Sequence, residues 1–457
     1  MRNFVCLIVF LALVGEVPGS IYLGKWDTPF QIVGVILLVP HVKFPLLDFI
    51  AVGVTAMNSI RLGPKHCVAP LLQYIKVALL ATLGLWVWGV IRGGNAYQSI
   101  FQLHGFVMLF PMATMVITTM RTHKDLFAIG ATLIAAAMVR ATMAFIFFFI
   151  MMPKLNIVVG DVGSGFCVTT HSDTALFVTA IIIALSWALE SRSKRSILAG
   201  LVVFVYIAAA IQVNNRRLAW VSLFAGFLIL YSLLPKNKIK RSINRAILLL
   251  APVVVAYIAI GWGRTEGIFK PVGSLSTLFG KKEDASSETR NIENYNLIQT
   301  LKTNPLLGTG WGHEYHEISV AYSIAEIFPQ YRFIPHNSVL GLLAFTGLLG
   351  FAGTWMFLPV TVYLSARSYR ISKIPIERAA AISAIVEVAV YANQAYGDMG
   401  LGTTTCTTLM ACGMAVAGRV PLMSGAWPSA RPKPKLAGGE EVKPAAGEEP
   451  KSEQPTV

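Results

Sequence analysis

Long apolar segments recur along almost the whole of this chain, and the charged residues lie between them. A helix needs roughly 20 apolar residues to cross a hydrocarbon core ~30 Å thick, and many of these segments reach that length. They are continuously apolar, rich in Leu, Ala, Ile and Phe, and lack the period-two alternation of membrane strands. The pattern therefore predicts an all-α integral membrane protein.

The apolar segments set the expected helices. We predict membrane-spanning helices at about 71–91, 99–119, 126–152, 173–189, 197–213, 216–234, 244–262, 337–365, 376–396 and 400–420. The first 60 residues add a short run at 3–14 and a longer run at 28–57 interrupted between Pro40 and Pro45, which we interpret as one helix and one broken helix. The total is about 12 transmembrane helices. Residues 1–20 also resemble a signal peptide, and the sequence leaves open whether they are cleaved.

The distribution of Lys and Arg predicts the orientation, because basic connectors are retained on the cytoplasmic side. Five connectors carry this bias: Arg61 and Lys65; Arg121 and Lys124; Arg192, Lys194 and Arg195; Lys236, Lys238, Lys240 and Arg241; Arg367, Arg370 and Lys373. Alternating the helices between them leaves 263–335 as one long periplasmic loop carrying short helices. The polytopic membrane domain would span 1–423, and the Pro, Lys and Glu-rich segment 424–457 would be a disordered cytoplasmic tail.

The net charge of +15 follows mainly from those connectors. It predicts contact with anionic membrane lipids, and no interleaved basic and aromatic patch supports nucleic-acid binding. The five cysteines show no paired spacing, so neither a disulfide framework nor a zinc site is indicated. The segment from His313 to Glu317 has Glu where a His-Glu-x-x-His metal motif needs its second His, so we predict no metal site.

The residues around His336 carry the most informative pattern. Pro335-His336-Asn337-Ser338 opens an apolar segment, and Asn337 or Ser338 is a plausible N-cap. Gly341, Ala344, Gly347 and Gly350 then form a stripe of small residues along which another helix could pack. His336 would therefore be held at the mouth of a membrane helix, where it could accept a proton.

The outer loop has structure of its own. Arg290, Asn294, Leu297 and Leu301 fall on one helical stripe, and Asn304-Pro305 ends the expected helix. Arg290 would thus stand on a short amphipathic helix lying over the membrane. A tight apolar turn rich in glycine follows, and its Trp311 is suited to the membrane interface.

Several arginines contradict the basic-inside bias. Arg216, Arg217 and Arg264 lie at outer helix boundaries, and Arg140 lies deep within 126–152. Guanidinium groups bind phosphate bidentately and keep their charge where solvent is scarce, so these arginines could hold a diphosphate. Since a lipid diphosphate is already a good leaving group, transfer to an alcohol would further require only a base near the hydroxyl.

Three stretches then resemble the bacterial O-antigen ligase superfamily: His336-Asn337, nine residues, Gly347, two residues and Gly350; Arg290 followed by Pro305-Leu306-Leu307-Gly308-Thr309-Gly310; and Arg217-Leu218-Ala219, similar to a Ser-Arg-x-Ala-like helix start. The resemblance extends over about 200–420. Asn215-Arg216 stands where the family has a serine before its arginine, so the counterpart of that arginine stays open between Arg216 and Arg217.

The resemblance implies a metal-independent, cofactor-free glycosyltransferase of the bacterial inner membrane, working at the periplasmic face. It would take a glycan from undecaprenyl diphosphate and deliver it to a sugar hydroxyl of a glycan or lipid A-core acceptor. Arg217 and Arg290 would hold the diphosphate, and His336 would bind or deprotonate the acceptor hydroxyl. The remaining candidate substrate-binding residues are Arg216, Arg264, Asn337, His171 and Arg140. The superfamily also contains repeat-unit polymerases, and the signature favours the ligase.

Simpler interpretations compete with each role. His336 could be an interfacial cap residue, Arg216 and Arg217 head-group anchors, and Arg290 the partner of Glu288 or Glu293 on its own helix. His171 could cap the helix that follows it, and Arg140 could pair with a buried polar group. A transporter is the rival class; it would use intramembrane charges such as Arg140, His104 and Glu387. A non-catalytic scaffold is a third possibility.

Overall fold

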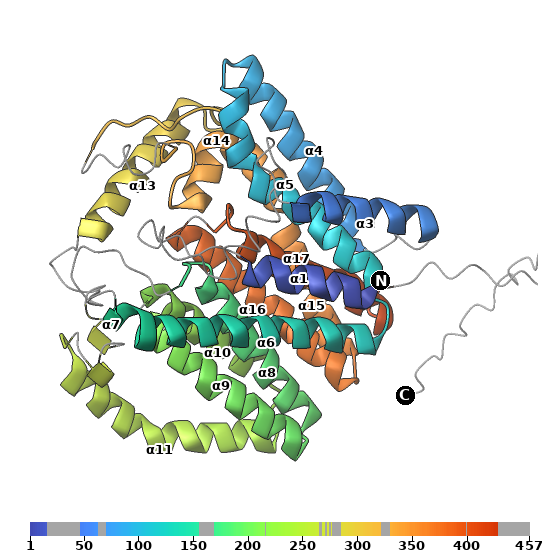
Figure 1. Cartoon of the computed structure of the whole chain (residues 1–457), viewed down its shortest axis with the longest axis vertical. Helices are drawn as coiled ribbons and strands as arrows, with labels where there is room; N and C mark the ends of the chain where they lie inside the picture. Colours follow the sequence, from blue (N-terminus) through green and yellow to red (C-terminus); the bar gives the residue numbers. More distant parts are fainter. Residues whose placement is uncertain are drawn as a thin grey trace, which may run out of the picture.

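A computed structural model describes the chain over residues 1–15, 46–62, 70–154, 169–214, 216–264, 267–269, 272–273, 276, 285–320, 330–398 and 400–427. Within these ranges the regular elements are helices, and most of them gather into one bundle (Figure 1). The predicted all-helical architecture is therefore confirmed. The interrupted run at 28–57 and the tail from 428 onward lie largely or wholly outside the described residues.

The helices follow the expected apolar segments closely. They are α4 (Pro70–Ile91), α5 (Ala96–Thr119), α6 (His123–Ile146), α8 (Asp173–Ser191), α9 (Lys194–Asn214), α10 (Arg217–Leu233), α11 (Lys238–Gly261), α14 (Ser338–Trp355), α15 (Phe357–Ile371), α16 (Pro375–Gly397) and α17 (Thr404–Met423). Shorter or less apolar elements are α1 (Arg2–Val14), α3 (Leu46–Leu62), the π-helical turn Phe147–Met151, α7 (Met152–Lys154), the 3-10 turn Gly267–Phe269 and α13 (Ala285–Thr303). Among the described residues, 8 helical stretches are long and apolar enough to cross a membrane. The count of twelve stays a prediction.

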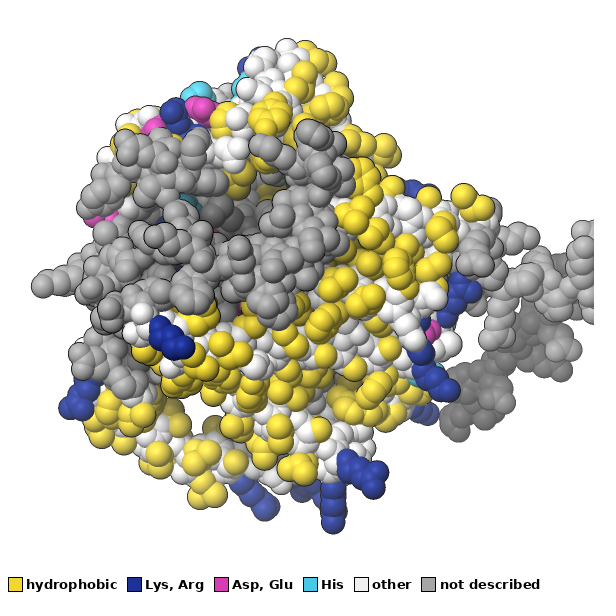
Figure 2. Space-filling view, in the orientation of Figure 1, with side chains coloured by type: hydrophobic (Ala, Val, Ile, Leu, Met, Phe, Trp, Pro, Cys, Tyr) yellow, Lys and Arg dark blue, Asp and Glu magenta, His cyan; other side chains and the backbone are white. Residues whose placement is uncertain are grey.

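The centre of the bundle is formed by α8, α16 and α17. Small residues line the contacts, with Ala381 and Ala384 of α16 and Ala415 and Ala417 of α17 almost fully buried. Such residues let helix backbones approach closely. In a membrane this close packing stabilises helix association, because lipid tails are as apolar as the helix surfaces and the hydrophobic effect contributes little. Helix α11 lies at the edge of the bundle (Figure 1), and none of its membrane-length window is buried. Figure 2 shows a largely hydrophobic face with Lys and Arg side chains at its edges, as a lipid-facing surface requires.

The expected single helix over 337–365 is interrupted, and this prediction needs correction. Helices α14 and α15 meet at Met356, and inside α14 Gly347 adopts φ 63°, ψ −175°. The glycine-rich turn after α13 lies against this kink: the backbone N–H groups of Leu348 and Leu349 donate to the carbonyls of Pro305 (2.8 Å) and Leu306 (3.1 Å). The kink frees α14 backbone groups that an unbroken helix would use internally, and the turn satisfies them.

Two glycines make this contact possible. Gly308 has φ +67°, and a Cβ there would lie 2.4 Å from the carbonyl carbon of Phe345. A Cβ on Gly347 would lie 2.3 Å from the carbonyl carbon of Leu306. Both positions combine a left-handed backbone with a close approach, so only glycine fits. The small-residue stripe was expected to pack against another helix. Gly350 does so against Leu85 of α4, whereas Gly347 packs against the turn at Leu306. Trp311 was expected at the membrane interface, but its side chain is buried in the protein and packs against Phe345.

Candidate functional site

His336 and Asn337 stand directly before α14, and both contact side chains of α13. Asn337 is the N-cap of α14, as predicted, and its side chain accepts a hydrogen bond from the Leu340 N–H at 3.1 Å. Its Nδ2 donates to Asn294 Oδ1 at 2.9 Å. Asn294 and Leu297 both belong to the stripe predicted for α13, and Leu297 is fully buried. The buried face of α13 is mostly polar, with Glu293, Asn296 and Thr300 beside Leu297, so polar contacts and not the predicted amphipathic pattern hold this helix against the start of α14.

His336 contacts the carboxylate of Glu293, which the sequence suggested only as a partner for Arg290. The backbone N–H of His336 donates to both carboxylate oxygens of Glu293 at 3.2 Å, and its Nδ1 lies 3.4 Å from Glu293 Oε1. A carboxylate only accepts hydrogen bonds, so Nδ1 carries a proton; in the neutral imidazole the lone pair then lies on Nε2. The imidazole is 29% exposed whereas Glu293 is 6% exposed. Glu293 was considered only as a partner for Arg290; its position three residues after Arg290 was the available signal.

A small cavity adjoins the histidine. It holds about 30 Å³ and is lined by Thr289, Ile292, Glu293, Asn296, Tyr315, Glu317, Ser319, Val320, Tyr331 and His336. This volume accommodates a single water-sized group. Burial is the main reason that the pKa of the Tyr315 hydroxyl is raised, with the Glu293 carboxylate adding to the effect. A hydroxyl entering here would meet a histidine already oriented by a carboxylate.

Three arginines interact electrostatically between the start of α10 and α13. Arg216 is the N-cap of α10 and Arg217 its first residue, and Arg290 stands on α13 one turn before Asn294. Burial lowers the pKa of the Arg216 guanidinium to about 10. The Asp398 carboxylate opposes this fall in pKa, whereas the positive charges of Arg290 and Arg217 add to it. These electrostatic effects mean that the three guanidinium groups share one region, which has a surplus of positive charge.

Residues from two further helix ends complete the region. The Nη2 of Arg216 lies 2.9 Å from His171 Nε2, and His171 Nδ1 pairs with the carboxylate of Asp398. Asp398 is the C-cap of α16, and its carbonyl accepts a hydrogen bond from the Ser338 hydroxyl at 3.3 Å. Ser338 follows His336 and Asn337 directly, so this hydrogen bond connects the start of α14 with the end of α16. Asp398 was not predicted; the signal was an acidic residue at the outer end of the 376–396 segment.

Two sequence candidates lie apart from this cluster. Arg140 is fully buried and forms a bidentate ion pair with Asp173, with Nε to Oδ1 at 2.8 Å and Nη2 to Oδ2 at 2.6 Å. Its Nη2 also donates to the Thr170 hydroxyl at 3.1 Å. Arg264 is exposed and stacks over the Phe269 ring at 5.3 Å. The geometry thus supports the structural interpretation of Arg140, and no described contact joins Arg264 to the cluster.

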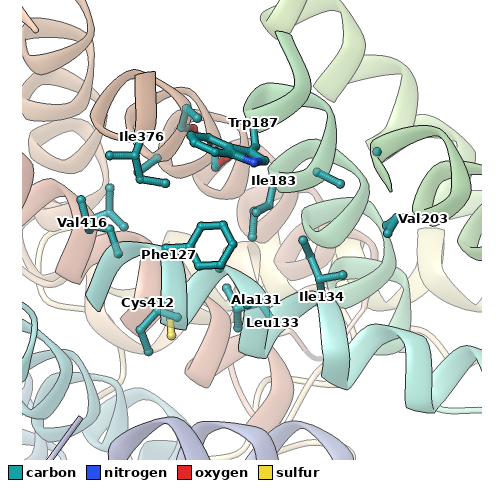
Figure 3. A pocket seen from close by; sticks show the side chains of 18 of the residues that line it. Phe127, Ala131, Leu133, Ile134, Ile183, Trp187, Val203, Ile376, Cys412 and Val416 are labelled. Carbon is teal, nitrogen blue, oxygen red and sulfur yellow. Dashed lines mark hydrogen bonds between the residues drawn. The ribbon is translucent and has the colours of Figure 1, made fainter. Parts of the chain in front are cut away.

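The other intramembrane charges considered for a transporter are also dispersed. His104 of α5 pairs with Asp48 of α3, and Glu387 of α16 lies against the backbone of Gly413. Glu387 also lines an apolar cavity of about 380 Å³ between α6, α8, α9, α16 and α17 (Figure 3). None of the candidate site residues lines this cavity. Its Ile183 lies ten residues beyond the start of α8, roughly 15 Å along the helix axis.

The site lies at the end of the bundle opposite several basic connectors. Helix α8 begins at the site and ends at Ser191, next to Arg192, and α10 begins at the site and ends shortly before Lys236. Helix α16 runs the other way, starting after Lys373 and ending at Asp398. One end of these helices therefore carries the site and the other carries basic loops.

Comparison with known proteins gives one family and no curated relative. Residues 202–355, about a third of the chain, match the family model described as O-antigen ligase. The matched part includes Arg216, Arg217, Arg290 and His336, whereas His171 and Asp398 lie outside it. No curated protein matches the chain significantly. This match over residues 202–355 supports the O-antigen ligase superfamily that the sequence motifs resemble.

Proposed function

We propose that this protein is a glycosyltransferase that moves a glycan from undecaprenyl diphosphate to an acceptor sugar hydroxyl at the periplasmic face of the bacterial inner membrane. The observation that carries the proposal is the contact of the His336 start of α14 with both α13 and Asp398. These contacts support a site in which a carboxylate-oriented imidazole acts together with Arg216, Arg217 and Arg290.

The arginines supply the charge that departure of a diphosphate requires. A diphosphate bound by guanidinium groups keeps its negative charge balanced while the bond to the anomeric carbon breaks. Arg217 and Arg290 are the proposed donors to it, with Arg216 beside them. Because these three cations already supply positive charge, the reaction as proposed needs no divalent metal.

His336 supplies the base. With its Nδ1–H directed at Glu293, the Nε2 lone pair would accept the proton of an acceptor hydroxyl as the new glycosidic bond forms. Asn337 fixes the helix start on which this histidine stands. Arg264, on the exposed turn after α11, is a proposed outer contact for the glycan. The orientation is supported by the basic connectors at the other end of the bundle, since such loops are retained inside.

The experiment that tests the proposal compares cells that lack this protein, complemented with wild type or with His336→Ala. The readouts are the surface-glycan ladder and the lipid-linked glycan pool. We expect His336→Ala to leave the acceptor without glycan while long chains accumulate on the lipid carrier, as for a ligase. Single repeats on the acceptor would instead identify a polymerase. A wild-type ladder from His336→Ala would refute the role of His336.

A further inference from the structure

A chain of three polar side chains joins separate helix ends within the site. Asp398 ends α16, His171 precedes α8, and Arg216 begins α10. Arginine has no acceptor atom, so the 2.9 Å contact with Arg216 must use a lone pair on His171 Nε2. The histidine proton then lies on Nδ1, where the Asp398 carboxylate accepts it. The hydrogen-bond direction along the chain is therefore fixed by the chemistry of its two ends.

Both ends of this chain are anchored. Asp398 is 5% exposed, its N–H donates to the carbonyl of Gln394 at 2.9 Å, and its own carbonyl accepts from the Ser338 hydroxyl. At the other end, the Nε of Arg216 is buried and has no hydrogen-bond partner among the described residues. One nitrogen of this guanidinium is thus held by the protein while another buried donor remains for a ligand oxygen.

The charge balance explains why Arg216 needs this support. Arg290 and Arg217 repel its guanidinium, and Asp398 is the carboxylate that offsets them. A long side chain carrying a repelled charge has many rotamers in which it points away from its neighbours. A neutral imidazole that accepts from Nη2 holds the guanidinium inside the cluster without cancelling its charge.

We propose that Asp398 and His171 are positioning residues that hold Arg216 ready to bind the diphosphate of the donor lipid. The proposal rests on the proposed function for the identity of the ligand. It assigns a role to two residues outside the O-antigen ligase match, and His171 then acts through Arg216 and does not bind substrate itself.

The chain offers a matched control at the other end of the same helix. His123 pairs with Glu377 at 2.7 Å in the first turn of α16, about 32 Å from Asp398 along the axis. His123 is 47% exposed and His171 43%, and both acidic partners are buried. Substitutions in this second pair reproduce the loss of a His-carboxylate contact without touching the site.

The test is calorimetric binding of farnesyl diphosphate to the purified full-length protein in detergent. Asparagine carries its amide near the Nδ1 position of histidine, and glutamine near the Nε2 position. We expect His171→Asn and Asp398→Asn each to raise the Kd about tenfold, because an ordered charged hydrogen bond is lost. His171→Gln keeps an acceptor for Arg216 but loses the contact with Asp398, so it should raise the Kd no more than Asp398→Asn does, whereas His123→Asn and Glu377→Gln should leave it within about twofold.

A double substitution separates positioning from general damage. His171 and Asp398 act in series, so His171→Asn combined with Asp398→Asn should bind no worse than the weaker single variant, with melting temperatures near wild type. Multiplying effects, near a hundredfold, or a wild-type Kd for His171→Asn, would overturn the proposal. If the wild-type protein binds no farnesyl diphosphate, diphosphate binding by the arginines is refuted, and with it both proposals. Binding with the expected variant pattern but without glycan transfer would refute the proposed function alone.

Discussion

Replacing Arg140 with methionine tests whether this membrane arginine supports the fold or contacts substrate. The substitution removes a guanidinium that is fully buried and leaves the carboxylate of Asp173 buried without its bidentate partner. Removing one member of a buried ion pair costs about 3–5 kcal/mol, because the remaining charge stays desolvated. The lost contact to the Thr170 hydroxyl adds about 1 kcal/mol.

A loss of about 5 kcal/mol lowers the melting temperature by roughly 10–20 °C if each kcal/mol shifts it by about 2–4 °C. We therefore expect Arg140→Met to show a fall of that order in a fluorescence melting assay of the purified protein in detergent. Arg140→Met combined with Asp173→Asn removes both charges and keeps an acceptor for the Thr170 N–H, so it should recover at least half of the loss.

The kinetic readout decides between the two interpretations. Since Arg140 has no exposed surface, the folded double variant should transfer glycan with a donor KM within about twofold of wild type. An Arg140→Met protein that melts within about 2 °C of wild type, but whose donor KM is raised tenfold, would refute the structural reasoning. Arg140 would then be a substrate-binding residue.

Three further predictions concern the site and the turn that supports it. Glu293→Gln should lower kcat for transfer by roughly 10–100-fold with little change in donor KM, because the partner of the His336 Nδ1–H loses its charge; an unchanged kcat would contradict the orienting role. Gly347→Ala should destabilise the protein by more than about 2 kcal/mol through backbone strain and collision with the turn, whereas Gly84→Ala, with open space around it, should be neutral or slightly stabilising, as melting curves will show. Arg216 is cationic below its pKa, so farnesyl diphosphate binding should be constant between about pH 8 and 9 and weaken as the pH rises through about 10, by up to about tenfold per unit. Affinity that persists to pH 12 would show an arginine with its ordinary pKa.

Several local features of the site could be predicted from the sequence because they depend on neighbours in the chain. The start of α14 at Ser338 follows from an asparagine that accepts a backbone N–H three residues later. The end of α13 at Thr303 follows from Asn304-Pro305. The predicted stripe on α13 was right only in part: Leu297 is buried and Asn294 contacts α14, whereas Arg290 is exposed.

The roles of single charged residues were predictable only in part. Arg216 and Arg217 were recognised as unusual because arginine is rare at an outer helix boundary, and Arg290 was recognised from the family resemblance; the three guanidinium groups interact electrostatically. Arg140 was equally unusual, but its partner Asp173 lies 33 residues away, and no local pattern relates the two. The rarity of a charge indicates that it has a partner or a function, and only the packing of helices identifies which.

The sequence by itself determined the helical class, the approximate helix bounds and the basic connectors, because hydrophobic length and charge depend on consecutive residues. Tertiary structure alone decided that Glu293 holds His336, that Asp398 and His171 hold Arg216, and that Gly347 breaks α14 to receive the turn at Leu306. These contacts join residues far apart in the chain. Their geometry depends on how helices pack, which a one-dimensional pattern of apolar and polar residues does not specify.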